Sequence, residues 1–308
     1  MKKVIFTLLL GTIFTFAGYT QTTVKGWSAM DDKKFSKKLA YGKGTGMVAK
    51  RVEDASQLAK FDKIGILGFS LYQPTYSDKK PFSVVTPYLT DAGSTFFVDE
   101  FFAVSLPEIR DEFAKSQSAL LTPDEYLDTD EKIQHYNSVE FEHAKMWKMV
   151  GSISNKIRGG RVDDIKGAPK GYKYLLAVNA DAKMWREIGK FTGEIELDAV
   201  LVIETTFGFD GRQIVLQKIE MALIGPNPVP YNKKHKKYYA PFGPVKGYLE
   251  GLNYGFVSVI PPKGGILIAK LKKGKITESH YEGIGAIYGR IAAILLAKTK
   301  ADWNDILK

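Results

Sequence analysis

One short apolar run limits the folds open to this chain more than any other feature. Residues 63–71 read Lys-Ile-Gly-Ile-Leu-Gly-Phe-Ser-Leu, with no charge after Lys63 and almost no polar side chain. Such a run is typical of a strand that is buried on both faces, and such a strand needs packed layers on both sides of its sheet. We therefore expect this strand at the centre of a sheet that is covered by helices.

The first half of the chain reads as further strands alternating with helices. A less regular strand is expected at 82–89, and apolar residues at helical spacing predict a helix over 96–115 that is interrupted or restarts at Pro107. The same spacing predicts a helix over 130–150.

The sequence between these two predicted helices contains the pattern of a helix N-terminus. Thr122 and Glu125 stand three residues apart with Pro123 at the first helical position, which is the pattern of a capping box. A short strand over 118–122 should therefore lead directly into a helix.

The second half of the chain is expected to pair its strands as hairpins. The expected elements, in order, are a strand at 174–178, a helix at 180–191, strands at 195–207, 213–224, 255–260 and 266–271, and a helix at 283–298 with a helical tail around Trp303. Turn signals stand between the second and third strands, at 210–211, and between the last two, at 261–265. We predict an α/β (α+β) fold: a mixed β-sheet with β-hairpins in the second half, flanked by helices.

The beginning of the chain has the pattern of a secretory leader. Lys2 and Lys3 precede residues 4–17, which are largely apolar and uncharged, and polar residues follow at once. A transmembrane anchor is the alternative, but it needs roughly 20 apolar residues. We expect residues 1–21 to be a signal peptide, so that the protein is exported to the periplasm or the cell exterior, peripheral to the outer membrane.

Composition bounds the rest of the chain. The polar, lysine-rich residues 22–46 are interpreted as a flexible lead-in, and residues 47–308 as a single α/β domain with a helical insertion around 126–171. The chain contains no cysteine, which excludes disulfides, thiol catalysis and an acylated cysteine. The net charge of +10 favours anionic partners, for which exported surroundings offer acidic glycans, lipid headgroups or acidic proteins instead of nucleic acid.

A basic, tyrosine-rich loop is the most distinctive surface segment. Its candidate contact residues are Tyr231, Lys233, Lys234, His235, Lys236, Lys237, Tyr238 and Tyr239. Flanking prolines would hold the loop extended, so that it could contact an anionic glycan or a lipid headgroup surface. An ordinary solvated charged loop is an equally good interpretation.

No catalytic, metal-binding or cofactor-binding set is predicted. His135 and His143 are too far apart for a zinc motif, and Ser70 lacks the second glycine of a nucleophile elbow, so it is interpreted as part of a strand. Gly285 and Gly289 do not match a dinucleotide-binding pattern. We expect these two glycines to let their helix pack closely on the sheet.

The order of elements resembles a known group of envelope domains. A helix over 185–191 runs into residues 197–202 (Leu-Asp-Ala-Val-Leu-Val), which is similar to the helix and strand of the CsgG/LpoB/TolB-N-terminal-like group: the curli-secretion component, the penicillin-binding-protein activator lipoproteins and the N-terminal domain of the Tol-system β-propeller protein. The likeness spans roughly residues 62–224. It implies an envelope binding or assembly module without catalytic residues, although the chain lacks the lipoprotein cysteine and its stretch 126–171 is longer.

These observations lead to one functional hypothesis and two rivals. The hypothesis is an exported, periplasmic, non-enzymatic binding or assembly accessory protein of the cell envelope, with envelope proteins or an anionic surface as partners. The first rival is an oligomeric secretion or pore subunit, for which residues 247–272 would supply the membrane-crossing strands. The second is a secreted hydrolase with a carboxylate-based site, since scattered carboxylates leave no reliable sequence signature.

Overall fold

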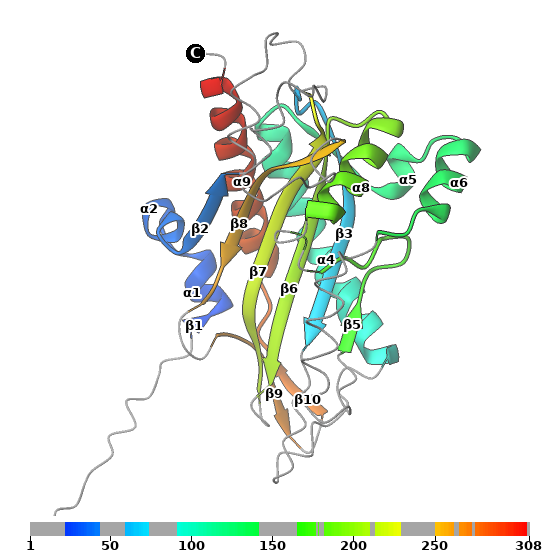
Figure 1. Ribbon diagram of the computed structural model, residues 1–308. Coiled ribbons are helices and arrows are strands. Elements are labelled where there is room, and N and C mark those ends of the chain that lie inside the picture. Colours follow the sequence, from blue (N-terminus) through cyan, green and yellow to red (C-terminus); the bar gives the residue numbers. More distant parts are fainter. Residues whose placement is uncertain are drawn as a thin grey trace, which may run out of the picture.

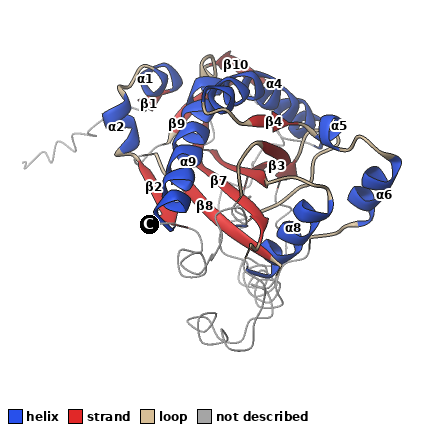
Figure 2. Cartoon of the chain, turned by 90° about the horizontal axis from the view of Figure 1, so that it is seen from above, coloured by secondary structure: helices blue, strands red, loops and turns tan. Residues whose placement is uncertain are grey.

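The computed structural model describes residues 22–43, 59–73, 91–141, 165–176, 178, 182–209, 213–228, 250–261, 265–272 and 275–306. The expected leader, the expected strand at 82–89 and the basic tyrosine-rich loop lie outside these ranges. The described strands form one mixed sheet, and its main path runs in the order β1 (Thr22–Thr23), β9 (Ile266–Lys272), β7 (Gln213–Pro226), β6 (Ala199–Phe209), β3 (Lys63–Gln73) and β4 (Ala119–Leu121). Helices cover both of its faces, so the predicted α/β class with a mixed sheet is confirmed (Figure 1, Figure 2).

The central strand is the apolar run that opened the sequence. β3 (Lys63–Gln73) pairs in parallel with β4 (Ala119–Leu121) on one side and with β6 (Ala199–Phe209) on the other. Ile64 and Phe69 belong to the core on one face of the sheet, while Leu67 belongs to the core on the opposite face. Burial on both faces explains why this strand carries no charged side chain after its first residue.

Two sets of helices build the two cores. α4 (Asp91–Lys115) and α9 (Ile284–Ile306) supply side chains to the larger core, on the first face. α5 (Pro123–Tyr126), α6 (Asp130–Ser138) and α8 (Ala182–Glu194) supply the smaller core, on the other face. The capping box of Thr122 and Glu125 is confirmed as the start of α5. 

The strands of the second half pair differently from the prediction. β6 and β7 (Gln213–Pro226) form the expected antiparallel pair. β8 (Gly251–Val259) and β9 (Ile266–Lys272), however, do not form a hairpin: both are antiparallel to β7, β8 along residues 219–226 and β9 along residues 213–216. The two strands therefore follow one another along one edge of β7, and β9 forms its antiparallel pair with β10 (Lys275–Ser279) instead. The proline- and glycine-rich residues 261–265 thus separate two strands that pair in succession with β7. The same residue types are typical of a hairpin turn, so the sequence does not distinguish the two cases.

Three helical predictions need correction. α4 is continuous through Pro107. The proline removes the hydrogen bond to the carbonyl of Ala103, but both residues are exposed, so water can bond to that carbonyl. α6 ends at Ser138, well before the expected residue 150, because Val139 has an extended backbone. Gly285 and Gly289 face α4 and not the sheet, since a Cβ on Gly285 would lie 2.1 Å from the carbonyl oxygen of Val104.

Two other stretches also differ. Residues 174–176 are not a strand, although Lys173 makes an isolated bridge to Gly68. Part of the expected insertion forms β5 (Ile165–Gly167), which pairs with the end of β3.

The expected flexible lead-in is folded from Thr22 to Lys43, so that prediction is wrong for these residues. They form β1 (Thr22–Thr23), α1 (Val24–Ser28), α2 (Asp32–Ser36) and β2 (Leu39–Lys43), here called the N-terminal strap. β1 pairs with β9 and β2 with β8. Three apolar side chains, Val24, Trp27 and Phe35, are buried. Lysines dominate the composition of the segment and conceal these anchors.

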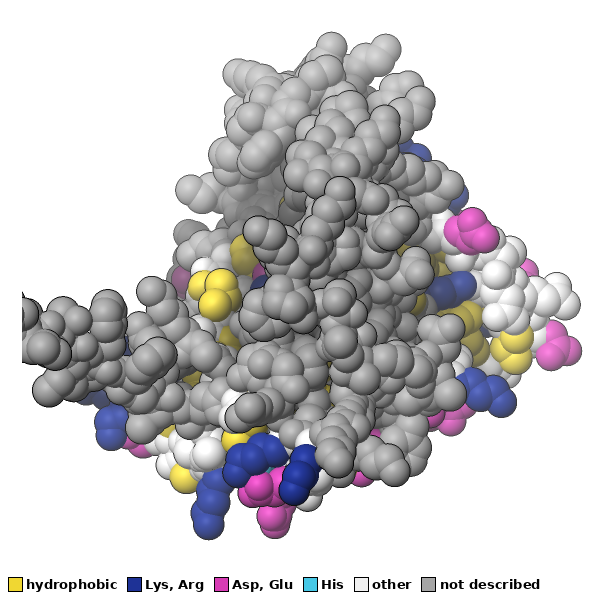
Figure 3. All heavy atoms as spheres, turned by 90° about the horizontal axis from the view of Figure 1, so that it is seen from below, with side chains coloured by type: hydrophobic (Ala, Val, Ile, Leu, Met, Phe, Trp, Pro, Cys, Tyr) yellow, Lys and Arg dark blue, Asp and Glu magenta, His cyan; other side chains and the backbone are white. Residues whose placement is uncertain are grey.

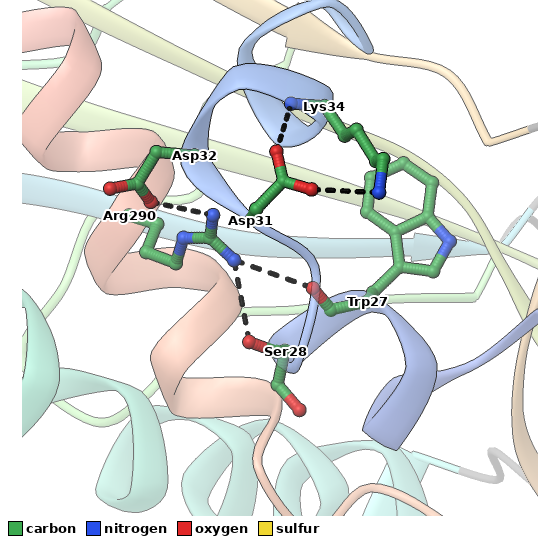
Figure 4. A network of polar contacts seen from close by, with 6 residues as sticks. All are labelled: Trp27, Ser28, Asp31, Asp32, Lys34 and Arg290. Atoms are coloured by element: carbon green, nitrogen blue, oxygen red, sulfur yellow. Dashed lines mark hydrogen bonds and ion pairs between the residues drawn. The ribbon is translucent and has the colours of Figure 1, made fainter.

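Arg290 of α9 binds the strap through hydrogen bonds and a cation–π contact. Its guanidinium donates to Asp32 at 2.8 Å and to the carbonyl oxygens of Trp27 and Ser28 at 3.4 and 3.3 Å (Figure 4). It also lies 4.0 Å from the ring centre of Phe35, a cation–π contact. One side chain thus joins both short helices of the strap to the C-terminal helix.

Replacing Arg290 by methionine is expected to loosen the strap while the rest of the fold persists. Asp32 is exposed, so most of the loss comes from the Phe35 stacking and the backbone contacts, in all about 1–2 kcal/mol. Faster trypsin cleavage after Lys33 and Lys34 and faster amide exchange over residues 24–36 would measure it. Lys298→Met is the control, because Lys298 is exposed and its contact with the Tyr41 ring, at 4.9 Å, belongs to β2 and lies outside the measured residues 24–36. Equal protection of the strap in the two variants would contradict the role given to Arg290.

Candidate functional site

The chain connectivity singles out one end of the sheet. From β3 the chain passes through α4 to β4 on one side, and it reaches β6 on the other side through α8. α4 and α8 lie on opposite faces. In open α/β sheets ligands bind beyond the carboxyl ends of the strands where connections diverge in this way. The carboxyl ends of β3 and β6 are thus the first place to look for a site (Figure 1).

Polar side chains gather in this half of the sheet. Ser70, Glu204, Glu220 and Ser258 lie opposite one another in the pairing of β3, β6, β7 and β8. They are on the face that carries α8, because Val202 and Ala222, two residues away on their strands, belong to the smaller core. Ser70 is fully buried, and Glu204 and Ser258 are each only 8% exposed. We call these four residues the polar row.

A lysine joins the two carboxylates of the polar row. Lys218 Nζ lies 2.8 Å from Glu220 and 3.3 Å from Glu204. Burial alone would lower the pKa of Lys218, but the attraction of both carboxylates outweighs burial and raises it above its ordinary value. Lys218 is therefore a fixed positive charge at neutral pH and not a neutral amine that could attack a substrate.

Ser70 has a structural role. Its hydroxyl oxygen accepts a hydrogen bond from the backbone N–H of Leu175 at 2.9 Å, deep in the protein. The contact attaches residues 172–175 to the sheet, where the backbone N–H of Lys173 also donates to the carbonyl oxygen of Leu67 at 3.0 Å. The interpretation of Ser70 as a strand residue is confirmed.

The arrangement is suited to binding a polar group. Two carboxylates and one ammonium give the cluster a net charge of −1, with hydroxyl groups of Ser258 and Thr206 nearby in the ladder. A glycosidase pair needs one carboxyl group kept protonated in apolar surroundings and one ionised. Here both carboxylates contact the same ammonium, that of Lys218. Figure 3 views the molecule from this end, with described acidic and basic side chains side by side on its rim.

Of the residues singled out by sequence, Ser70 belongs to the polar row. Tyr231, Lys233, Lys234, His235, Lys236, Lys237, Tyr238 and Tyr239 lie outside the described residues, as does His143. His135 pairs with Glu194 at 2.8 Å and stacks on Phe191. Within the described ranges, no group of three or more side chains could hold a metal ion.

Asp198, just before β6, organises the backbone. Its carboxylate accepts hydrogen bonds from the backbone N–H groups of Asp62 and Lys63 at 2.7 and 2.9 Å. It therefore fixes the start of β3 against the start of β6.

Sequence reasoning missed the polar row, although Glu204, a charge within the apolar run of β6, was the signal that could have found it.

Comparison of the chain with protein-family models, with curated proteins and with solved structures finds no match. No helix among the described residues combines the length and apolar character that crossing a membrane requires.

Proposed function

We propose that this chain is exported and works as a non-enzymatic binding or assembly accessory protein of the cell envelope, in the periplasm or outside the cell and peripheral to the outer membrane. The proposal depends on one observation: the sequence of the expected leader is followed directly by a folded segment. β1 begins at Thr22, one residue after the expected signal peptide, and the hydroxyl of Thr23 caps α1. Cleavage must therefore leave both threonines.

The chemistry of the polar row supports binding over reaction. Lys218 stays protonated, Ser70 is committed to the Leu175 amide, and Glu204 and Glu220 share one counterion. These groups can hydrogen-bond a polar ligand or partner, but none is a free nucleophile or base.

The partner class follows from charge and from the resemblance. The mature chain keeps a net charge of +8, since residues 1–21 contain two lysines and no acidic side chain. Envelope proteins or an anionic glycan or lipid surface fit that charge, and the basic loop 231–239 is the segment proposed to meet them. The passage of α8 directly into β6 supports the proposed relation to the CsgG/LpoB/TolB-N-terminal-like domains.

Export is tested by making the full chain in a bacterial host. We expect recovery outside the cytoplasm, with an N-terminus between residues 18 and 22 by sequencing of the mature protein. Leu9→Arg is the matched control, because a charge in the apolar core disables a leader without changing its length. An uncleaved wild-type chain in the cytosol would refute the proposal, and recovery after crosslinking without any partner would count against the binding role.

The hydrolase rival depends on the same two carboxylates. Glu204 and Glu220 face each other across β6 and β7, as a carboxylate pair could. Hydrolysis of a glycan or peptide that is lost in Glu204→Gln would establish that rival. The pore rival is less favoured, because residues 251–259 and 266–272 are β8 and β9 of this sheet and most of their side chains on both faces are buried.

A further inference from the structure

We propose that the outer face of the N-terminal strap is a docking surface for the anionic lipid headgroups of the membrane that the leader crosses. The inference rests on the proposed export. It concerns four lysines of α2 and the residues after it, Lys33, Lys34, Lys37 and Lys38, here called the strap lysines. All four are exposed.

The acidic residues beside the strap lysines are already engaged. Asp31 caps α2 by accepting from the backbone N–H of Lys34, and its second oxygen pairs with the Lys34 ammonium at 2.9 Å. Asp32 binds Arg290. Lys33, Lys37 and Lys38 have no ion-pair partner among the described residues, so three charges of one sign are exposed to solvent within residues 33–38.

The strap presents these charges on a fixed support. Trp27 and Phe35 are buried and meet edge to face with ring centres 6.0 Å apart, and Arg290 ties both short helices to α9 (Figure 4). β2 then continues the strap into the sheet beside β8. A charged surface that is already ordered loses less entropy on binding than a mobile tail.

Position and composition point to lipid headgroups as the occupant. The strap directly follows the proposed leader in sequence, so until cleavage the leader would hold these residues at the membrane surface. The described exposed large apolar side chains, Val104, Ile133 and Ile260, are not in the strap. The strap therefore offers charge without an inserting side chain, and binding should be peripheral and sensitive to salt.

The test uses the chain without residues 1–21, sedimented with vesicles of phosphatidylglycerol and phosphatidylcholine in equal amounts. The variant carries Lys33→Gln, Lys37→Gln and Lys38→Gln, and it leaves the Asp31–Lys34 pair intact. We expect it to bind about 100-fold more weakly, since each lysine near an anionic bilayer contributes ~1 kcal/mol and ~1.4 kcal/mol is a factor of ten. Added salt should abolish wild-type binding.

The matched control carries Lys60→Gln, Lys170→Gln and Lys272→Gln. These three lysines are also exposed, and their loss changes net charge equally. We expect the control to bind nearly as the wild type does. Equal losses in the two triple variants would overturn the proposal, because net charge alone would then explain binding. Binding to a soluble acidic polysaccharide but not to vesicles, lost in the strap variant, would assign the surface to glycans and also overturn it.

The vesicle experiment is independent of export. A cleaved, exported protein that ignores anionic vesicles would refute the strap proposal and leave the proposed function standing. A chain that binds vesicles through the strap lysines but is never exported would refute the proposed function and leave lipid binding by the strap standing.

Discussion

Gly189→Ala is expected to lower the free energy of unfolding by about 1–2 kcal/mol, although alanine is the better helix former. α8 lies directly on the sheet at this glycine: a Cβ there would be 2.2 Å from Cα of Gly251 and 2.4 Å from the carbonyl oxygen of Gly225. Backbone atoms cannot swing away as a side chain can, so α8 must lift. Overpacking of this kind costs ~1–3 kcal/mol, and the gain of ~1 kcal/mol in helix propensity offsets only part of it.

Gly193 on the same helix supplies the control with the opposite sign. It is exposed, and its Cβ would meet only Pro226, at an ordinary 3.4 Å. Gly193→Ala should therefore raise stability by about 0.5–1 kcal/mol. Chemical denaturation of both variants checks the pair. Destabilisation by Gly193→Ala as large as that by Gly189→Ala would show that close approach to the sheet is not the cause.

Lys218→Met is expected to cost about 3 kcal/mol, the low end for breaking a buried ion pair. The substitution leaves Glu204 and Glu220 facing each other with side chains only 10% and 18% exposed. Like charges directly opposite in a β ladder repel. Denaturation midpoints at neutral pH measure the loss, and an unchanged midpoint would mean that the cluster carries no net interaction.

Two further readings separate the electrostatic cause from lost packing. Adding Glu204→Gln and Glu220→Gln to Lys218→Met should recover most of the stability, because no buried charge is then left without a partner. The single variant should also gain stability as the pH falls, since protonation removes the repulsion. In the wild type the pKa of Lys218 is raised, so its contribution is complete below its unfolded pKa and is lost only as the pH rises through the folded value, above its ordinary 10.5. No recovery in the triple variant would leave packing as the explanation.

Local patterns predicted the elements that local patterns determine. The apolar run of β3, the capping box of α5 and the strand pair β6–β7 are each encoded by neighbouring residues, and each was located correctly. The placement of β8 and β9 was not, because pairing depends on which distant strand offers a free edge. β7 is long enough to take both in succession.

The strap and the polar row escaped prediction for related reasons. Val24, Trp27 and Phe35 of the strap are fully buried, but its lysines give it the composition of a mobile tail. Lys218 and Glu220 are neighbours on one face of β7, but Glu204 joins them only through the register of β6 and β7, which shifts between Thr206 and Phe207. Neither the shift nor the contact is visible from residue types alone. Glu204 by itself indicated a charged position but not its partners.

The pairing of the strap sets an order of events for the chain as it is made or threaded through a pore. β1 and β2 emerge first, yet their partners β9 and β8 come near the opposite end of the chain, and Arg290 comes later still. The strap can therefore complete its pairing only after β8, β9 and Arg290 are available. Contacts so distant in sequence are slow to form, so the strap is among the last parts of the fold to be completed.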